Sequence, residues 1–212
     1  LVNSSHNTPS RDPGSYIYRN SESGFPPEPT WILDTDLAHG AACADIDRDG
    51  YLELLFGGHL SPEILIFHGG PDGYDAKNPE RIRMEYEGEV YDSSLWIYLA
   101  DLNNDGWLDL VVPQSRADRS LILWGGPEGF SMDRVQFLSV WKGVSARAAD
   151  LTGNGYLDLI VGAAPPTLAE PHDCFVYIYW NGPEGLREDR RTLLPANAVL
   201  SVAVADFDND GL

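Results

Sequence analysis

The chain has 212 residues, 43% of them hydrophobic, and its 33 acidic against 14 basic side chains give a formal net charge of −19. This charge argues against nucleic acid as a partner, because phosphates are held mainly by Lys and Arg, and it favours cations. No apolar run approaches the roughly 18 residues needed to span a bilayer, so no transmembrane segment is predicted.

Two short motifs recur along the chain in register. An acidic segment with glycine at its sixth position begins at Asp45, Asp101, Asp150 and Asp206, at intervals of about fifty residues. A glycine-proline turn follows the first three acidic segments, at residues 69–73, 125–129 and 181–185, and a weaker copy lies at residues 18–25. A repeat of this length is typical of propeller families.

Short apolar segments between these motifs predict β-strands. They lie directly after the acidic segments (52–56, 108–112, 157–161), before the turns (64–67, 121–124, 176–180), after the turns (81–86, 134–138), and before a lead aspartate, as at 201–205. Four strands per repeat predict an all-β fold, a β-propeller of four tandem four-stranded blades. The repeats span approximately 1–44, 45–100, 101–149 and 150–205, with the start of another at 206–212, in a single domain or domain fragment over 1–212.

Each end of the chain falls within a predicted strand. Unpaired strand edges are templates for association. The sequence therefore suggests a part of a larger propeller, or ends that pair with each other or with another copy, so that self-association through the terminal strand edges is possible.

The acidic segments have the residue types and spacing of calcium-binding loops. Calcium takes six to eight oxygens at roughly 2.3–2.6 Å, and alternate positions of a curling loop present side chains to one side. Glycine at position 6 permits the sharp turn, the carbonyl of position 7 points back, and a carboxylate at position 9 closes the shell. The predicted ligands are Asp45, Asp47, Asp49, the Tyr51 carbonyl and Glu53 in the first loop, and Asp101, Asn103, Asp105, the Trp107 carbonyl and Asp109 in the second.

The third and fourth loops depart from this pattern. The third has two carboxylates, and we expect it to bind calcium most weakly. The fourth lacks a ninth position in this chain, and we expect it to be incomplete. Their predicted ligands are Asp150, Thr152, Asn154, the Tyr156 carbonyl and Asp158 in the third, and Asp206, Asp208 and Asp210 in the fourth.

The alternative for these loops is a set of polar turns without metal, since Asp, Asn and Gly favour turns. Adjacent carboxylates would repel one another strongly without a cation, which favours the calcium interpretation for the first two loops. An EF-hand is excluded, because its position 12 requires a bidentate Glu. That position here is Phe56, Val112 or Val161, inside predicted strands.

The pattern Asp-x-Asp/Asn-x-Asp-Gly-x-x-Asp/Glu, followed by a strand and a Gly-Gly-Pro-x-Gly-Phe turn, resembles FG-GAP/VCBS repeats, the blades of integrin-α-like β-propellers. The resemblance covers nearly the whole chain. It implies that each loop joins the first two strands of a blade and that its calcium is mainly structural. Thr152 and Asn154 depart from the acidic pattern and leave the third site open.

The sequence favours a calcium-stabilised extracellular propeller that acts as an adhesion or ligand-binding module for a protein or carbohydrate, rather than an enzyme. A loop that fills its own calcium shell leaves little room for substrate, and no nucleophile motif or phosphate loop is recognisable. Two alternatives stay open: the propeller part of an extracellular carbohydrate-active enzyme such as a polysaccharide lyase, and a structural spacer in a large surface protein.

Location and ligand face follow from the calcium loops. Affinities of about 10⁻⁴–10⁻³ M, typical of extracellular modules, favour an extracellular, cell-surface or periplasmic location. The ligand face is expected on the loops away from calcium. Its candidate residues are Arg116, Arg119, His172 and Trp141.

Overall fold

The computed structural model describes residues 14–35, 38–165 and 173–207. Over these residues the protein is all-β, with antiparallel pairing throughout and one short helical turn, the 3-10 helix Met132–Arg134. In the described part of the chain no helix has the length and apolar character needed to cross a membrane.

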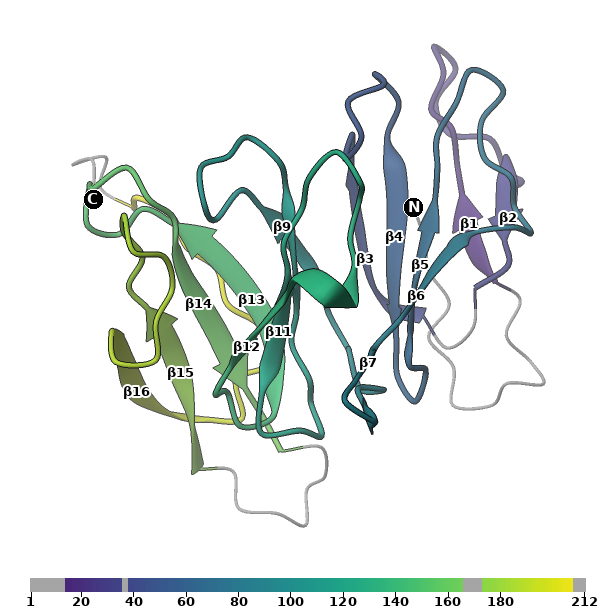
Figure 1. Cartoon of the computed structure of the whole chain (residues 1–212). Coiled ribbons are helices and arrows are strands. Elements are labelled where there is room, and N and C mark those ends of the chain that lie inside the picture. The colour runs from purple at the N-terminus through teal and green to yellow at the C-terminus, as the bar shows by residue number, and fades with distance from the viewer. Residues whose placement is uncertain (1–13, 36–37, 166–172, 208–212) are drawn as a thin grey trace. The chain divides into compact units, whose positions relative to one another are not determined.

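Three four-stranded antiparallel sheets make up most of the fold, and in each the strands pair in chain order (Figure 1). Two further sheets have two strands each. The four-stranded sheets are β3 (Ala38–Ala44), β4 (Glu53–Gly58), β5 (Glu63–Phe67) and β6 (Glu80–Arg83); β9 (Tyr98–Ala100), β10 (Asp109–Val112), β11 (Ser120–Leu123) and β12 (Val135–Leu138); and β13 (Gly143–Ala149), β14 (Asp158–Ala163), β15 (Asp173–Tyr179) and β16 (Arg191–Asn197). The pairs are β1 (Ser15–Ile17) with β2 (Trp31–Leu33), and β7 (Glu85–Tyr86) with β8 (Glu89–Val90).

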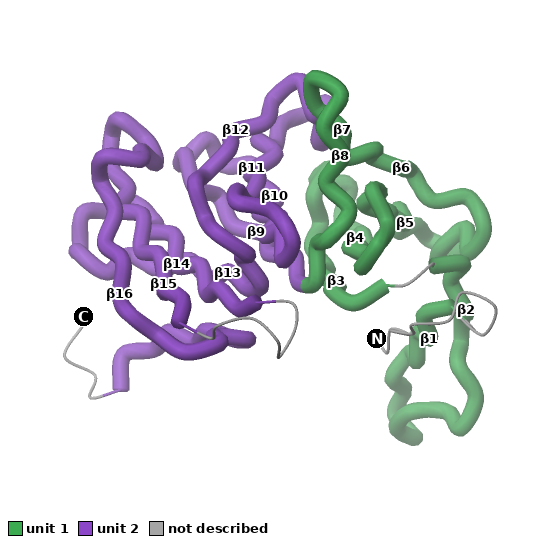
Figure 2. The backbone as a smooth tube through the Cα atoms, turned by 90° about the horizontal axis from the view of Figure 1, so that it is seen from below, with its two compact units in different colours: residues 1–95 green, residues 96–212 purple. Residues whose placement is uncertain are grey.

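The chain divides into two compact units, residues 1–95 and residues 96–212 (Figure 2). The first unit contains the sheet β3–β6 and the two strand pairs. The second contains the sheets β9–β12 and β13–β16.

The second unit has a core shared by its two sheets. One hydrophobic cluster contains Val111 and Ile122 from β10 and β11 together with Leu159 and Val161 from β14, all four fully or almost fully buried. Every residue of β14 is buried, so this strand is covered on both faces. An apolar run without alternation is the sequence signature of such a doubly covered strand.

The first unit has its own core between the β1–β2 pair and the sheet β3–β6. Leu33 of β2 lies in one cluster with Leu54, Phe56 and Phe67 of β4 and β5. The rings of Phe56 and Phe67 meet edge to face with centroids 5.7 Å apart, a favoured aromatic geometry. The two aromatic side chains therefore help to hold β4 and β5 to the strand pair.

The strands predicted from the sequence after each acidic loop and around each glycine-proline turn are confirmed. Each four-stranded sheet begins with the strand that precedes a lead aspartate. The repeat boundaries at residues 45, 101 and 150 thus fall between the first and second strands of a sheet, so that sheet and sequence repeat are offset by one strand.

Two expectations differ from the structure. Residues 201–205, predicted as a strand, are described without strand structure. A strand needs a hydrogen-bonded neighbour, and no described segment follows to pair with it. In the predicted first blade, the described residues before β3 form the pair β1–β2 rather than a four-stranded sheet.

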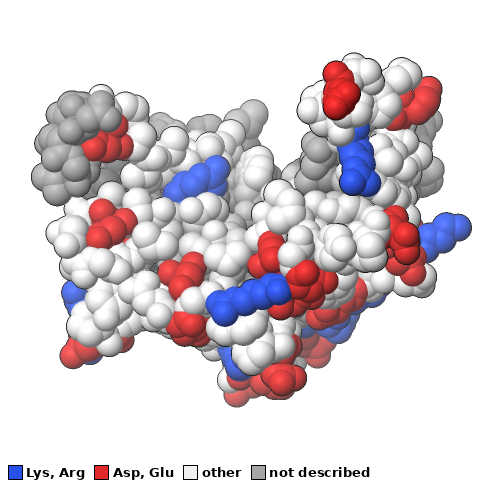
Figure 3. Space-filling model, turned by 90° about the horizontal axis from the view of Figure 1, so that it is seen from above, with Lys and Arg blue, Asp and Glu red and all other residues white. Residues whose placement is uncertain are grey.

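The acidic composition is visible on the surface. On the face in Figure 3, Asp and Glu side chains gather in several groups with isolated Lys and Arg side chains between them. Such a local excess of negative charge makes the electrostatic potential negative and attracts cations to the surface.

Candidate metal centre

The first three acidic loops occupy the same place in their sheets. They join β3 to β4, β9 to β10, and β13 to β14, which are the first and second strands of each four-stranded sheet. The repeated sequence motif therefore corresponds to a repeated hairpin connection.

Two positions of each loop have a left-handed backbone. Position 6 is glycine, as expected for a positive φ. Position 4 is left-handed as well, which the sequence analysis missed; the asparagine and glycine found there in two loops are the signal, because both tolerate this conformation. The φ values at position 4 are 65° for Arg48, 59° for Asn104 and 69° for Gly153, and at position 6 they are 90° for Gly50, 86° for Gly106 and 83° for Gly155.

Backbone N–H groups turn the loop carboxylates and amides inward. In each of the first three loops the lead aspartate accepts a hydrogen bond from the N–H of position 6, and the side chain of position 5 accepts one from the N–H of position 7. The first set joins Asp45 to Gly50 (3.1 Å), Asp101 to Gly106 (2.8 Å) and Asp150 to Gly155 (2.7 Å); the second joins Asp49 to Tyr51 (2.8 Å), Asp105 to Trp107 (2.7 Å) and Asn154 to Tyr156 (2.8 Å).

The carboxylate at position 9 clamps two parts of each repeat together. Glu53, Asp109 and Asp158 have no exposed surface. One oxygen accepts the N–H of loop position 2, and the other accepts the N–H of the first residue of the following turn. The distances are 2.9 Å to Ile46 and 3.2 Å to Gly69, 2.8 Å to Leu102 and 2.9 Å to Gly125, and 3.0 Å to Leu151 and 2.7 Å to Asn181.

This clamp explains why the two sequence motifs recur in register. The acidic loop and the glycine-proline turn are bound to one buried carboxylate, so every repeat must bring both motifs to it. The third repeat has extra residues between β14 and β15, and it still forms both clamp bonds.

Burial makes two of the clamp carboxylates, Asp109 and Glu53, harder to ionise. Loss of solvent raises the pKa of Asp109 to about 6, with Asp105 and Asp101 adding to the rise and the two backbone N–H groups opposing it. Burial also raises the pKa of Glu53. A cation beside such a group favours its charged form.

The first loop brings three carboxylates together. Oxygens of Asp45, Asp47 and Asp49 lie within 4.8 Å of one another. Oδ1 of Asp45 is buried and has no hydrogen-bond partner among the described residues. A buried, unpaired carboxylate oxygen is costly, and a coordinated cation would satisfy it. The donor set consists of hard oxygens, the type that calcium prefers.

A histidine adjoins the first loop. Ligand atoms of His68, Asp47 and Glu53 lie within 4.8 Å of one another. Nδ1 of His68 is 3.7 Å from Asp47, and Nε2 is 2.8 Å from Glu80. The sequence analysis missed this residue; the signal was the histidine before the first turn, where the other two turns have Trp124 and Trp180.

The second loop has the same inward arrangement with an amide at position 3. Asn103 accepts the N–H of Asp105 at 2.9 Å and donates its Nδ2 to the Asp105 carboxylate at 2.9 Å. Asp101 accepts the same N–H at 3.2 Å. The side chains of Asp101, Asn103 and Asp105 are therefore held within one loop.

The third loop is held by hydrogen bonds to one carboxylate. Asp150 accepts the N–H groups of Thr152 (3.3 Å), Asn154 (3.1 Å) and Gly155 (2.7 Å). These backbone donors, Gly155 first, lower the pKa of Asp150. Asn154 also donates its side-chain amide to the Asn181 carbonyl at 3.0 Å. The backbone donors thus stabilise part of the negative charge of Asp150 that a cation would otherwise stabilise.

Asn181 ties the second and third loops together within the second unit. It is 1% exposed, and its Nδ2 donates to the carbonyls of Leu102 at 2.7 Å and Leu157 at 2.9 Å. Asn104 adds a bond to the Gly155 carbonyl at 2.9 Å. The third turn has asparagine where the first and second turns have glycine, and its side chain binds both loops.

Replacing Asn181 with alanine is expected to lower the free energy of unfolding by about 2 kcal/mol, because two carbonyls lose their common donor in a buried place. Urea denaturation would measure the change. Asn78→Ala, which removes an exposed bond to Asp75, is the matched control and should change stability by less than about 0.5 kcal/mol. Equal effects of the two substitutions would contradict the proposed tie.

The remaining predicted residues fall in other connections. Asp206 is exposed, whereas Asp208, Asp210 and His172 lie outside the described residues. Arg116 and Arg119 lie between β10 and β11, and Trp141, 37% exposed, lies between β12 and β13. The Lys142 N–H donates to the Ala117 carbonyl at 2.8 Å, which places these two connections side by side.

Contacts already occupy two of these side chains. Arg119 lies 3.4 Å from Asp118 and 5.3 Å from the centroid of the Phe137 ring. Nζ of Lys142 lies 4.5 Å from the centroid of the Trp141 ring. Their role as a ligand face stays a prediction.

Comparison with known families agrees with this repeated geometry. Residues 101–161 match the family described as FG-GAP-like repeat. The matched stretch contains the second and third acidic loops and the glycine-proline turn between them. Residues 101–161 therefore contain an FG-GAP-like repeat.

Proposed function

We propose that this protein is a calcium-stabilised β-propeller-type module that binds a ligand or mediates adhesion. The observation that carries the proposal is the first loop, where three carboxylates converge and Oδ1 of Asp45 is buried without a hydrogen-bond partner in the described residues. Asp45, Asp47 and Asp49 would hold the ion there, with the carbonyl of Tyr51 and the clamp residue Glu53 completing the site.

The second loop is proposed as an equivalent site with Asp101, Asn103 and Asp105. The third loop is proposed as the weakest, because backbone donors already surround Asp150. In each case the ion supplies positive charge that offsets the repulsion between carboxylates, and the residues of the chain orient the oxygens through their hydrogen bonds to the backbone.

The blade arrangement is part of the proposal. Three four-stranded meanders carry an acidic loop in the same connection, and the chain has an FG-GAP-like repeat. We propose that these sheets are blades of a propeller. Within the second unit the two sheets share one core, as neighbouring blades do.

Binding is favoured over catalysis for the calcium loops, because their oxygens are directed into the loop itself. Millimolar calcium is available outside cells, and loop sites of this kind bind in the range of about 10⁻⁴–10⁻³ M. This supports an extracellular, cell-surface or periplasmic location as part of the same proposal.

Calcium is expected to raise the thermal midpoint of the protein. A site with a Kd of about 10⁻⁴ M adds about 2.7 kcal/mol of stability at about a hundredfold higher calcium concentration. Calorimetric melts in calcium and in excess chelator would measure the shift, and isothermal titration would give the number of sites.

The variant Asp49→Asn removes one charge from the first loop, and Asp118→Asn, at a side chain 76% exposed, is its matched control. The first should reduce the calcium-dependent shift and the second should leave it unchanged. A midpoint that is the same in calcium and in chelator would overturn the proposal.

A further inference from the structure

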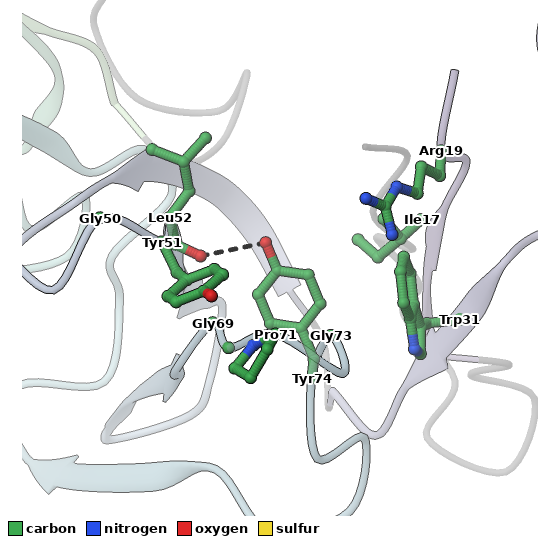
Figure 4. Close-up of a pocket in the computed structure, with 11 residues that line it drawn as sticks. Ile17, Arg19, Trp31, Gly50, Tyr51, Leu52, Gly69, Pro71, Gly73 and Tyr74 are labelled. Atoms are coloured by element: carbon green, nitrogen blue, oxygen red, sulfur yellow. Dashed lines mark hydrogen bonds between the residues drawn. The ribbon is translucent and has the colours of Figure 1, made fainter. Parts of the chain in front are cut away.

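A cavity of about 340 Å³ lies in the first unit, beside the first acidic loop (Figure 4). One side comes from the β1–β2 hairpin and carries Arg19 and Trp31. The other comes from the loop residues Tyr51 and Leu52 and from Tyr74, which follows the glycine-proline turn. Its volume lies at the small end of the range of ligand pockets, about 300–1,000 Å³.

Aromatic rings form much of the lining. Trp31 and Tyr74 meet edge to face with centroids 5.7 Å apart, so the two sides are in contact there. The Tyr74 hydroxyl donates to the Leu52 carbonyl at 3.0 Å, which holds this ring against the loop. Tyr51 is 41% exposed and lies beside Pro71 on the loop side of the cavity (Figure 4).

Glycines allow the close approach of these walls. A Cβ atom at Gly73 would lie 2.3 Å from the Trp31 ring, so only glycine lets the indole rest on the turn. The Trp31 ring therefore lies directly against the backbone of the turn and closes the cavity on that side.

The cavity has one charge, and it is positive. Arg19 is the charged side chain among the lining residues, although the protein has a net charge of −19. Within the described part of the chain Arg19 forms no ion pair, and Figure 4 shows its guanidinium turned toward the Tyr74 side. A guanidinium beside aromatic faces favours a carboxylate, which it can bind through two parallel hydrogen bonds.

The corresponding place in the second unit is closed. Gln136 of β12 and Leu186 after the third turn occupy the positions of Trp31 and Tyr74 in the repeat. There the Gln136 side chain donates to the Leu186 carbonyl at 2.9 Å, and Leu186 is 5% exposed in the core. The aromatic cavity is therefore a property of the first unit and not of the repeat in general.

We propose that this cavity binds a sugar ring that bears a carboxylate. The negative faces of Trp31 and Tyr51 attract the polarised C–H bonds on the flat side of a sugar. Arg19 binds the carboxylate, and the Tyr51 hydroxyl binds a ring hydroxyl. An acidic peptide side chain would satisfy Arg19 but leave the aromatic faces uncovered.

The inference deepens the proposed function, and its calcium dependence rests on that function. Gly50, Tyr51 and Leu52 belong both to the cavity and to the first acidic loop. Without a cation, the carboxylates of Asp45, Asp47 and Asp49 would repel an anionic sugar next to them. Calcium is therefore expected to strengthen sugar binding.

The test uses the methyl glycosides of glucuronate, galacturonate and N-acetylneuraminate in calcium buffer, with the indole N–H signal of Trp31 observed by NMR. At least one should shift this signal with a Kd of about 1 mM or lower. Arg19→Gln should weaken binding about tenfold, as should methyl esterification of the sugar carboxylate. Arg83→Gln, which changes an exposed arginine paired with Glu85, is the matched control and should bind as the native protein does.

The sugar-binding proposal is overturned if none of the three sugars binds, if Arg19→Gln or the methyl ester binds as tightly, or if a glutamate-containing peptide binds more tightly than the sugars. Melts in calcium and chelator separate this result from the proposed function. A calcium-dependent rise in the thermal midpoint without sugar binding overturns only the sugar-binding proposal. Sugar binding that depends on Arg19, with the same thermal midpoint in calcium and in chelator, supports the sugar-binding proposal and overturns the calcium proposal.

Discussion

Replacing Asp109 with alanine is expected to reduce the free energy of unfolding by about 3 kcal/mol. The Asp109 carboxylate is fully buried and accepts the N–H groups of Leu102 and Gly125. Each buried donor left unsatisfied costs about 1–3 kcal/mol. The relief of removing a buried carboxylate offsets part of this cost, which is why the expected value lies below the sum of the two upper limits.

Amide hydrogen exchange gives a local measurement of this prediction. The N–H groups of Leu102 and Gly125 should exchange faster in the Asp109→Ala protein, because their acceptor is gone. The conservative variant Asp109→Asn retains one acceptor oxygen and should have an intermediate loss of stability. Asp118→Asn, at an exposed position, should stay within about 0.5 kcal/mol of the native protein. Unchanged protection of both amides in Asp109→Ala would contradict the clamp.

Replacing Gly125 with alanine is expected to cost about 3 kcal/mol for a different reason. A Cβ atom there would lie 2.1 Å from the Leu108 carbonyl oxygen and 2.9 Å from its carbon. These are backbone atoms, so relief requires the loop and turn to separate, and that movement also weakens the bond from the Gly125 N–H to Asp109. Overpacking of this kind typically costs 1–3 kcal/mol before the lost hydrogen bond is counted.

Gly70→Ala is the matched control for this substitution. Gly70 is the second glycine of the first turn, and the nearest atom to its Cβ position is the Gly73 carbonyl oxygen at 3.7 Å. Urea denaturation should show a change within about 0.5 kcal/mol for Gly70→Ala. Similar losses for both variants would show that the steric argument is wrong.

Asn181 shows how the third repeat avoids this restriction. It occupies the position of Gly125, and its amide donates to the Leu157 carbonyl, the counterpart of the Leu108 carbonyl. The Leu108 carbonyl oxygen excludes an alanine side chain in the second repeat, whereas its counterpart in the third repeat, the Leu157 carbonyl oxygen, accepts a hydrogen bond. The residue at this position therefore decides whether the turn meets the loop of its own repeat through close backbone contact or through an amide.

Much of the fold could be predicted from local patterns. The strands around each acidic loop and turn appear where the short apolar segments predicted them. The left-handed glycine at position 6 also follows from residue type and spacing. These features depend on residues close together in the chain, where covalent geometry and turn preferences leave few choices.

The candidate site was predictable in part. Spacing identified the side chains at positions 1, 3 and 5 as one group, and the structure places oxygens of Asp45, Asp47 and Asp49 together. Spacing did not identify His68, because this residue comes from the end of another strand. It also did not predict that both oxygens of Glu53, Asp109 and Asp158 bind the main chain.

The sequence by itself determined the repeat, its strands and its acidic loops, since each depends on neighbours within a few residues. The tertiary structure alone decided that a buried carboxylate joins each loop to its turn, that Asn181 connects two loops, and that Trp31 and Tyr74 border a cavity with Arg19. These contacts join segments far apart in the chain, and packing of the sheets, rather than local preference, selects them.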